Sequence, residues 1–104
     1  MKKYPPFPDN KGKRKSLINI SGKRRYFTIL GEIKRAQSNA PHKVIYLQRM
    51  LWEDNNEIQL RLAYYIIGKK PKMRGKWVFG QFATIMTVKD FRFIFRTAKR
   101  KGWI

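Results

Sequence analysis

Residues 43–67, KVIYLQRMLWEDNNEIQLRLAYYII, carry the clearest structural signal in this chain. Two runs rich in β-branched and aromatic residues, Lys43–Trp52 and Ile58–Ile67, flank a short polar segment. Asn55 and Asn56 in that segment suit the positive φ angles of a tight turn. The pattern therefore predicts two antiparallel strands joined as a hairpin.

Apolar residues alternate along the second of these runs. Positions 58, 60, 62, 64 and 66 are all aliphatic or aromatic, whereas the positions between them are mixed. An antiparallel sheet with one solvated side buries one of its faces. We therefore expect the apolar face of this strand to pack on the core.

Two further strands are indicated on either side of the hairpin. Lys76–Met86 follows a basic loop and reads as a third strand, in which Gly80 predicts a bulge or a close backbone approach. Ser16–Ile20 is apolar enough for a short strand that ends at Ser21 and Gly22.

Segment Arg25–Gln37 is ambiguous between helix and strand. Starting at Tyr26, apolar residues recur at i, i+3, i+4 and i+7, which is the helical period, and we predict a helix. Against this, the segment opens with a β-favouring run, and Gly31 disfavours a helix interior by about 1 kcal/mol. A strand through Tyr26–Leu30 is the alternative.

The C-terminal segment has the start and stop signals of a helix. Thr87 suits the N-cap, Asp90 in the first turn favours the helix dipole, and Gly102 suits the position after the last turn. Trp103 and Ile104 can then fold back on the helix. The expected apolar stripe consists of Phe91, Ile94, Phe95 and Ala98.

These elements predict an α+β fold: a three-stranded antiparallel meander with a C-terminal helix and an N-terminal helix packed on one face. With 104 residues and 42% hydrophobic residues, the chain is large enough for one core. We expect residues 1–15, rich in proline and lysine, to form a flexible basic arm, and residues 16–104 to form a single α+β domain.

Positive charge is unevenly distributed along the chain. The sequence contains 25 Lys and Arg against 6 Asp and Glu, a net charge of +19, yet residues 26–67 are almost neutral. Self-repulsion of this size destabilises a compact state unless a polyanion compensates it. The distribution therefore predicts a nucleic-acid partner, with DNA slightly favoured over RNA.

The candidate nucleic-acid-binding residues fall into three groups, which we expect to converge on one side of the molecule and to bind phosphates. Phe93 shares the outer face of the helix. The candidates are Lys11, Lys13, Arg14, Lys15, Lys23, Arg24 and Arg25 near the N-terminus; Lys69, Lys70, Lys72, Arg74 and Lys76 in the basic loop; and Lys89, Arg92, Arg96, Lys99 and Arg100 on the helix.

Signatures of enzymes and of metal sites are weak. There is no cysteine, His42 is the only histidine, and no glycine-rich phosphate loop is present. Glu53, Asp54 and Glu57 cluster, but in the hairpin turn. We therefore assign no catalytic residue, metal or cofactor, and favour a binding protein. A small metal-independent ribonuclease or toxin, and a structural component of a ribonucleoprotein, are the alternatives.

The sequence also indicates where the protein acts. No apolar run approaches the ~20 residues of a membrane span, and the first residues lack the apolar core of a secretion signal. We expect a cytoplasmic or nucleoid-associated protein without a membrane partner.

Overall fold

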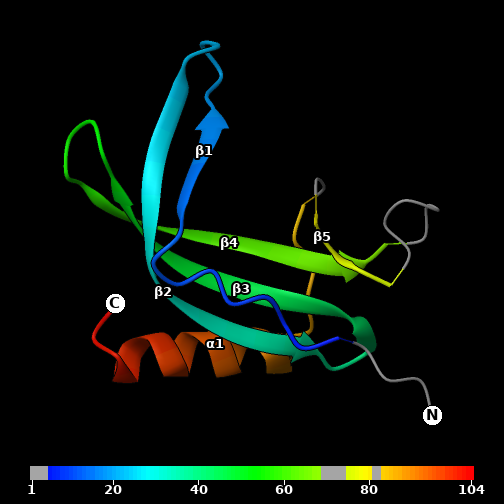
Figure 1. The fold of residues 1–104 in the computed structure, drawn as a ribbon. Coiled ribbons are helices and arrows are strands. Elements are labelled where there is room, and N and C mark those ends of the chain that lie inside the picture. Colours follow the sequence, from blue (N-terminus) through cyan, green and yellow to red (C-terminus); the bar gives the residue numbers. More distant parts are fainter. Residues whose placement is uncertain (1–4, 69–74, 81–82) are drawn as a thin grey trace.

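A computed structural model describes residues 5–68, 75–80 and 83–104 (Figure 1). Within these ranges the chain is mostly β, with a curled antiparallel sheet of five strands in sequential order and one C-terminal helix. The strands are β1 (Arg14–Ile18), β2 (Arg24–Gln37), β3 (Ala40–Trp52), β4 (Ile58–Ile67) and β5 (Trp77–Phe79), and the helix is α1 (Val88–Arg100).

The predicted N-terminal helix is wrong, because segment 25–37 forms β2, the longest strand described. Its pairing with β3 is regular up to Ile29, opposite Met50, and resumes at Gly31, opposite Arg49. Leu30 is therefore the extra residue of a β-bulge. An extra residue reverses which face each later side chain points to. The buried residues of β2 therefore keep a spacing of two in the sequence but lie on opposite faces before and after the bulge. The helical spacing depended on Tyr26, Leu30 and Ala36, which are at most partly buried.

The bulge gives β2 a core on each side of the sheet. Before the bulge, Phe27 and Ile29 are fully buried and pack with Met50 and Trp52 of β3. After it, Ile33 is buried on the opposite face. We call the first face the arm face and the second, on which α1 lies, the helix face.

α1 confirms the predicted C-terminal helix and its N-cap. The Thr87 hydroxyl accepts a hydrogen bond from the Asp90 N–H at 3.1 Å. Ile94 and Ala98 are buried against Ile33 and Ile45 of the helix face. Only part of the predicted apolar stripe is buried, however, because Phe91 and Phe95 remain half exposed.

Trp103 extends this packing beyond the last turn of α1. It packs against the same apolar cluster, and a Cβ on Gly31 would lie only 2.9 Å from its indole ring. Gly31, which sequence considerations treat as a helix breaker, thus makes room for the indole. Trp103 therefore folds back on the helix as predicted. Ile104 does not, because its side chain stays half exposed.

The number and extent of the strands also correct the three-stranded prediction. The hairpin of residues 43–67 is confirmed as β3 and β4, with Asn56 at a φ of 57° in its turn. The short N-terminal strand exists but spans Arg14–Ile18. The strand expected over Lys76–Met86 is wrong in length, since β5 ends at Phe79.

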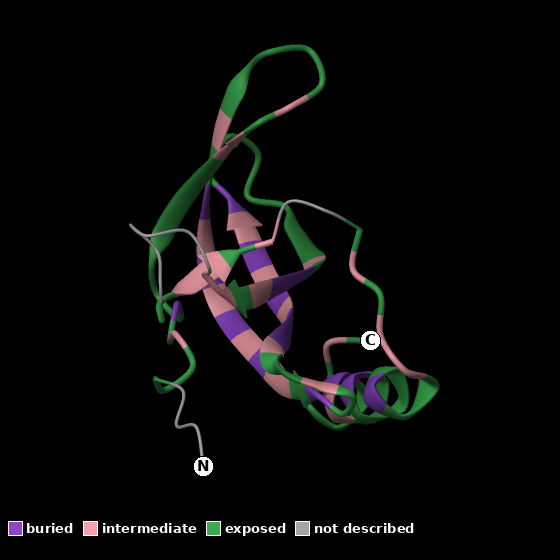
Figure 2. Cartoon of the chain, turned by 90° about the vertical axis from the view of Figure 1, so that its right-hand side faces the viewer, coloured by how far each residue is buried: buried purple, intermediate pink, exposed green. Residues whose placement is uncertain are grey.

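The predicted apolar face of β4 is covered only at Tyr64, which is buried. Ile58, Leu60, Leu62 and Ile66 are 36–47% exposed, while Ala63 on the other face is buried. The reason is that α1 packs over β2 and β3 and does not extend over β4. Figure 2 shows the buried residues concentrated in the middle of the sheet and on the inner side of the helix.

Residues 5–13 run along the arm face and are held there by polar contacts. The backbone N–H and side-chain amide of the buried Asn10 donate to the Glu32 carboxylate at 3.1 and 3.0 Å, and Gln48 donates to the same carboxylate at 2.7 Å. The Tyr46 hydroxyl donates to the Pro8 carbonyl. Arg14, in the predicted arm, begins β1. The division of the chain at residue 15 stays a prediction.

The close approach predicted at Gly80 is confirmed, and it supplies a test of the packing. The Gly80 N–H donates to the Tyr64 carbonyl at 2.7 Å, and an added Cβ would lie 2.0 Å from the buried Tyr64 ring. Gly80→Ala should lower the free energy of unfolding, measured in urea, by about 1–3 kcal/mol. Gly31→Ala should cost less, because its added Cβ would lie 2.9 Å from the Trp103 ring, a milder overlap than that at Gly80. Wild-type stability of Gly80→Ala would contradict the packing.

Candidate nucleic-acid interface

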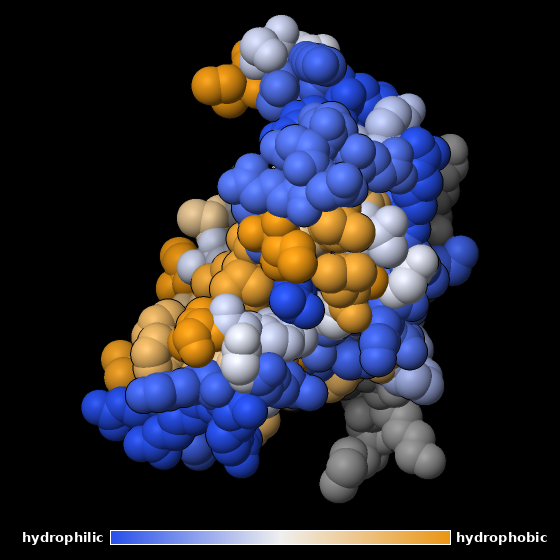
Figure 3. All heavy atoms as spheres, turned by 90° about the vertical axis from the view of Figure 1, so that its left-hand side faces the viewer, coloured by the Kyte–Doolittle hydropathy of each residue, from blue (hydrophilic) through white to orange (hydrophobic). Residues whose placement is uncertain are grey.

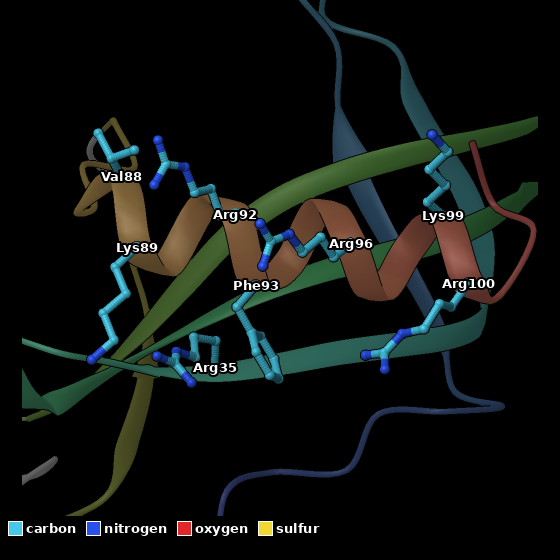
Figure 4. Close-up of a pocket in the computed structure, with 8 residues that line it drawn as sticks. All are labelled: Arg35, Val88, Lys89, Arg92, Phe93, Arg96, Lys99 and Arg100. Carbon is cyan, nitrogen blue, oxygen red and sulfur yellow. The ribbon is translucent and has the colours of Figure 1, made fainter.

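An open groove runs along the outer side of α1, beside the end of β2 (Figure 4). Six of its eight lining residues are Lys or Arg, and its volume of about 990 Å³ lies at the upper end of the range for ligand clefts. The groove therefore suits an extended anion better than a single small one. We call it the helix groove; its lining residues are Arg35, Val88, Lys89, Arg92, Phe93, Arg96, Lys99 and Arg100.

Helical spacing brings five of these cations together. Lys89, Arg92, Arg96, Lys99 and Arg100 follow one another at mostly three- or four-residue intervals, so they share the outward side of α1. Among the described residues, none of the five forms an ion pair with a carboxylate. Five of the six cations that line the helix groove therefore lack a compensating carboxylate in the described structure.

This arrangement is unfavourable for the free protein. Like charges at i, i+3 or i+4 destabilise a helix by about 0.2–0.5 kcal/mol each, and the five cations form four such pairs, or about 1–2 kcal/mol. Lys99 and Arg100 recover part of this cost at the C-terminal end of the helix dipole. A solvated helix surface needs no such repulsion, so the cations fit a surface that meets an anion.

Arg35 joins the groove from β2. Its guanidinium lies 4.5 Å from the centre of the Phe93 ring and donates from Nε to Asp90 Oδ1 at 3.0 Å. These two contacts fix the side chain against the edge of α1 (Figure 4). Arg35 is a groove residue that the sequence prediction missed. Nothing in the sequence marks it as one, because only the tertiary structure places it beside Phe93.

The buried Asp90 carboxylate holds the first turn of α1 on the sheet. Besides Arg35, Ser38 in the β2–β3 turn donates to it from its backbone N–H at 2.9 Å and from its hydroxyl at 2.6 Å. Burial alone would raise the pKa of Asp90, but these hydrogen bonds from Ser38 and Arg35 hold it well below its usual range. The carboxylate therefore stays ionised and keeps the helix groove aligned with β2.

A second group of predicted residues lies at the β1–β2 hairpin. Lys23, Arg24 and Arg25 line a smaller hollow with Glu53 and Asp54 of the β3–β4 turn. Arg25 donates to Asp54 at 2.7 and 2.9 Å.

Arg14 forms a two-bond pair with Glu53 in the same region. Hydrogen bonds from Arg14 and Arg25 hold the pKa values of Glu53 and Asp54 below their usual ranges. Part of the positive charge at the hairpin is therefore neutralised within the protein.

The structure does not bring the predicted residues of the β1–β2 hairpin and those of α1 together on one side (Figure 1). The β1–β2 hairpin and α1 lie at opposite ends of β2 (Figure 1). Lys11, Lys13 and Lys15 are exposed before and within β1, and Lys76 is exposed next to β5. The remaining loop candidates lie outside the described residues: Lys69, Lys70, Lys72 and Arg74.

Comparisons with protein-family models, with curated proteins and with solved structures gave no match to this chain. In the parts of the chain that the structure describes, no helix has the length and apolar character needed to cross a membrane.

The anchoring role of Asp90 is testable through stability. Asp90→Asn should lower the free energy of unfolding at pH 7 by about 2 kcal/mol, because it weakens charge-assisted hydrogen bonds to a buried group. Since the pKa of Asp90 is depressed in the folded state, its contribution is present above the unfolded value near 3.9 and is lost as the pH falls.

Urea unfolding at pH 7, 4 and 2.5 measures this effect. The difference between wild type and Asp90→Asn should shrink toward the lowest pH. Asp9→Asn, which changes an exposed loop carboxylate, serves as the control and should leave stability nearly unchanged. A difference that stays constant across this pH range would contradict the proposed anchoring by an ionised carboxylate.

Proposed function

We propose that this protein binds nucleic acid, DNA in preference to RNA, mainly through phosphate contacts in the helix groove. The observation that carries the proposal is the row of five helix cations without carboxylate partners in the described structure, extended by Arg35. Phosphate oxygens supply the charge that this row lacks. Arginine and lysine are also the side chains that most often contact a phosphate backbone.

The binding mechanism is the release of condensed counterions. Each phosphate that a lysine or arginine neutralises releases counterion, and log K falls with log[salt] with a slope of about −0.9 per phosphate for duplex DNA. Five helix cations on five phosphates would give a slope of roughly −4.5. The net charge of +19 adds long-range attraction that speeds association.

The other predicted groups play a secondary part. At the β1–β2 hairpin, Arg14 and Arg25 are already paired with carboxylates, whereas Lys23 and Arg24 remain available to a phosphate. The basic loop and the lysines before β1 add further charge along the backbone. Such a protein would act in the cytoplasm or on the nucleoid.

Removing two groove cations tests the proposal. Arg92→Ala with Arg96→Ala should weaken binding to duplex DNA at least tenfold at low salt and flatten the salt slope by about 1.8. The matched control, Lys23→Ala with Arg24→Ala, removes the same charge from the hairpin and should have a smaller effect. Fluorescence anisotropy with labelled 20-bp DNA at four salt concentrations measures both.

The outcomes separate the alternatives. Equal losses in the two double variants would show that net charge, and not the helix groove, determines binding. Tighter binding to duplex RNA or to single strands than to duplex DNA at one salt concentration would overturn the preference for DNA. Cleavage of labelled RNA in the presence of EDTA would favour the metal-independent ribonuclease.

A further inference from the structure

A second surface on the helix face is apolar and is only partly covered by the described residues. It comprises Ile58, Leu60 and Leu62 of β4 together with Phe91 and Phe95 of α1, all 39–51% exposed. Figure 3 shows this face, with hydrophobic side chains gathered between hydrophilic regions at the β1–β2 hairpin and at α1. We call these five residues the apolar surface.

Its two halves are joined by packed side chains. Leu62 is paired with Leu47 of β3, and Leu47 packs against the cluster that contains Ile94 and Ala98 of α1. On α1, the Phe91 and Phe95 rings stack, with centroids 6.1 Å apart. The exposed side chains of β4 and of α1 therefore lie on either side of Leu47, on the same face of the sheet. Monomeric proteins rarely expose contiguous apolar patches of more than a few hundred Å², and such patches commonly bind partners.

Arg49 places a positive charge within this region. It is paired with Leu60 across β3 and β4, so its side chain shares the helix face, and it is partly exposed. No carboxylate of the described residues forms an ion pair with it. A partner that covers Leu60 must also meet this charge, and a carboxylate does so without leaving it desolvated and unpaired.

The exposed apolar side chains and the charge of Arg49 together indicate which kind of molecule binds the apolar surface. A second copy of the chain is disfavoured, because a symmetric dimer would place the same Arg49 patch on both sides and join two molecules of +19 charge each. A nucleic-acid backbone offers charge but little apolar area for Leu60 and Leu62. A protein segment with an apolar face and acidic flanks satisfies both requirements.

We propose that the apolar surface docks an acidic amphipathic helix of a different protein, with apolar residues on Leu60, Leu62 and Phe95 and a carboxylate on Arg49. This interaction is independent of the helix groove, because Phe93 and Arg35 mark the groove side of α1, whereas Phe91 and Phe95 lie on another side of the helix. The protein would then hold a nucleic acid and a protein partner at separate surfaces.

Two synthetic peptides test the proposal. The first is an 18-residue amphipathic helix with leucines on one face and glutamates beside them, and the second carries lysine in place of each glutamate. Fluorescence anisotropy at 150 mM salt should show binding of the acidic peptide and at least tenfold weaker binding of the basic one. Leu62→Glu should abolish binding of the acidic peptide, and Arg49→Glu should reverse the preference between the peptides.

Control variants separate docking from simple attraction of opposite charges. Ile20→Glu introduces the same charge at a fully exposed residue away from the surface and should leave peptide binding unchanged within about twofold. The groove variant Arg92→Ala with Arg96→Ala should bind the acidic peptide as wild type does, even where it loses DNA. Circular dichroism tests whether Leu62→Glu is folded, and its spectrum should match that of the wild type.

Three results would overturn the proposal. If the groove variant lost binding of the acidic peptide and Leu62→Glu did not, the peptide would bind the groove cations and not the apolar surface. A dimer in sedimentation equilibrium that Leu62→Glu dissociates would make a second copy the occupant. Binding to phosphatidylglycerol vesicles that Leu62→Glu abolishes, with no binding of the acidic peptide, would make it a lipid surface.

Discussion

The bulge at Leu30 sends the side chains of the two halves of β2 to opposite faces of the sheet, and the rest of the structure is arranged around that reversal. Phe27 and Ile29 form a core with β3 on the arm face, while Ile33 packs against α1 on the helix face. A regular strand would place all three on one face. The position of the helix, and of both surfaces beside it, therefore follows from one extra residue.

The few acidic residues explain why the positive charge accumulates where it does. Glu53 and Asp54 neutralise arginines at the hairpin, Asp90 anchors the helix, and Glu32 accepts hydrogen bonds from Asn10 and Gln48. These carboxylates stabilise the protein internally, and none pairs with the cations on α1 in the described residues. The five cations of α1 thus lack carboxylate partners, whereas carboxylates neutralise part of the positive charge at the β1–β2 hairpin.

α1 also separates two kinds of surface. One side of the helix carries the groove cations and Phe93, whereas Phe91 and Phe95 continue the exposed apolar face of β4. A single helix laid across a wider sheet covers only the strands beneath it. The uncovered strand is then available to another molecule, and its chemistry differs from that of the groove.

Local signals in the sequence were sufficient for the β3–β4 hairpin, for the Thr87 cap of α1 and for the candidate cations on the helix, because each depends on residues a few positions apart. The residue spacing of β2 was misleading, since a bulge is defined by the strand opposite it. Likewise, which face of β4 is buried depends on where α1 docks.

The tertiary structure alone placed Arg35 beside Phe93 and left Arg49 without a carboxylate within the described chain. The sequence by itself thus determined the elements with local capping and turn signals and the total charge. Only the tertiary structure decided which of these charges are compensated and which apolar residues are covered, because both depend on contacts between residues far apart in the chain.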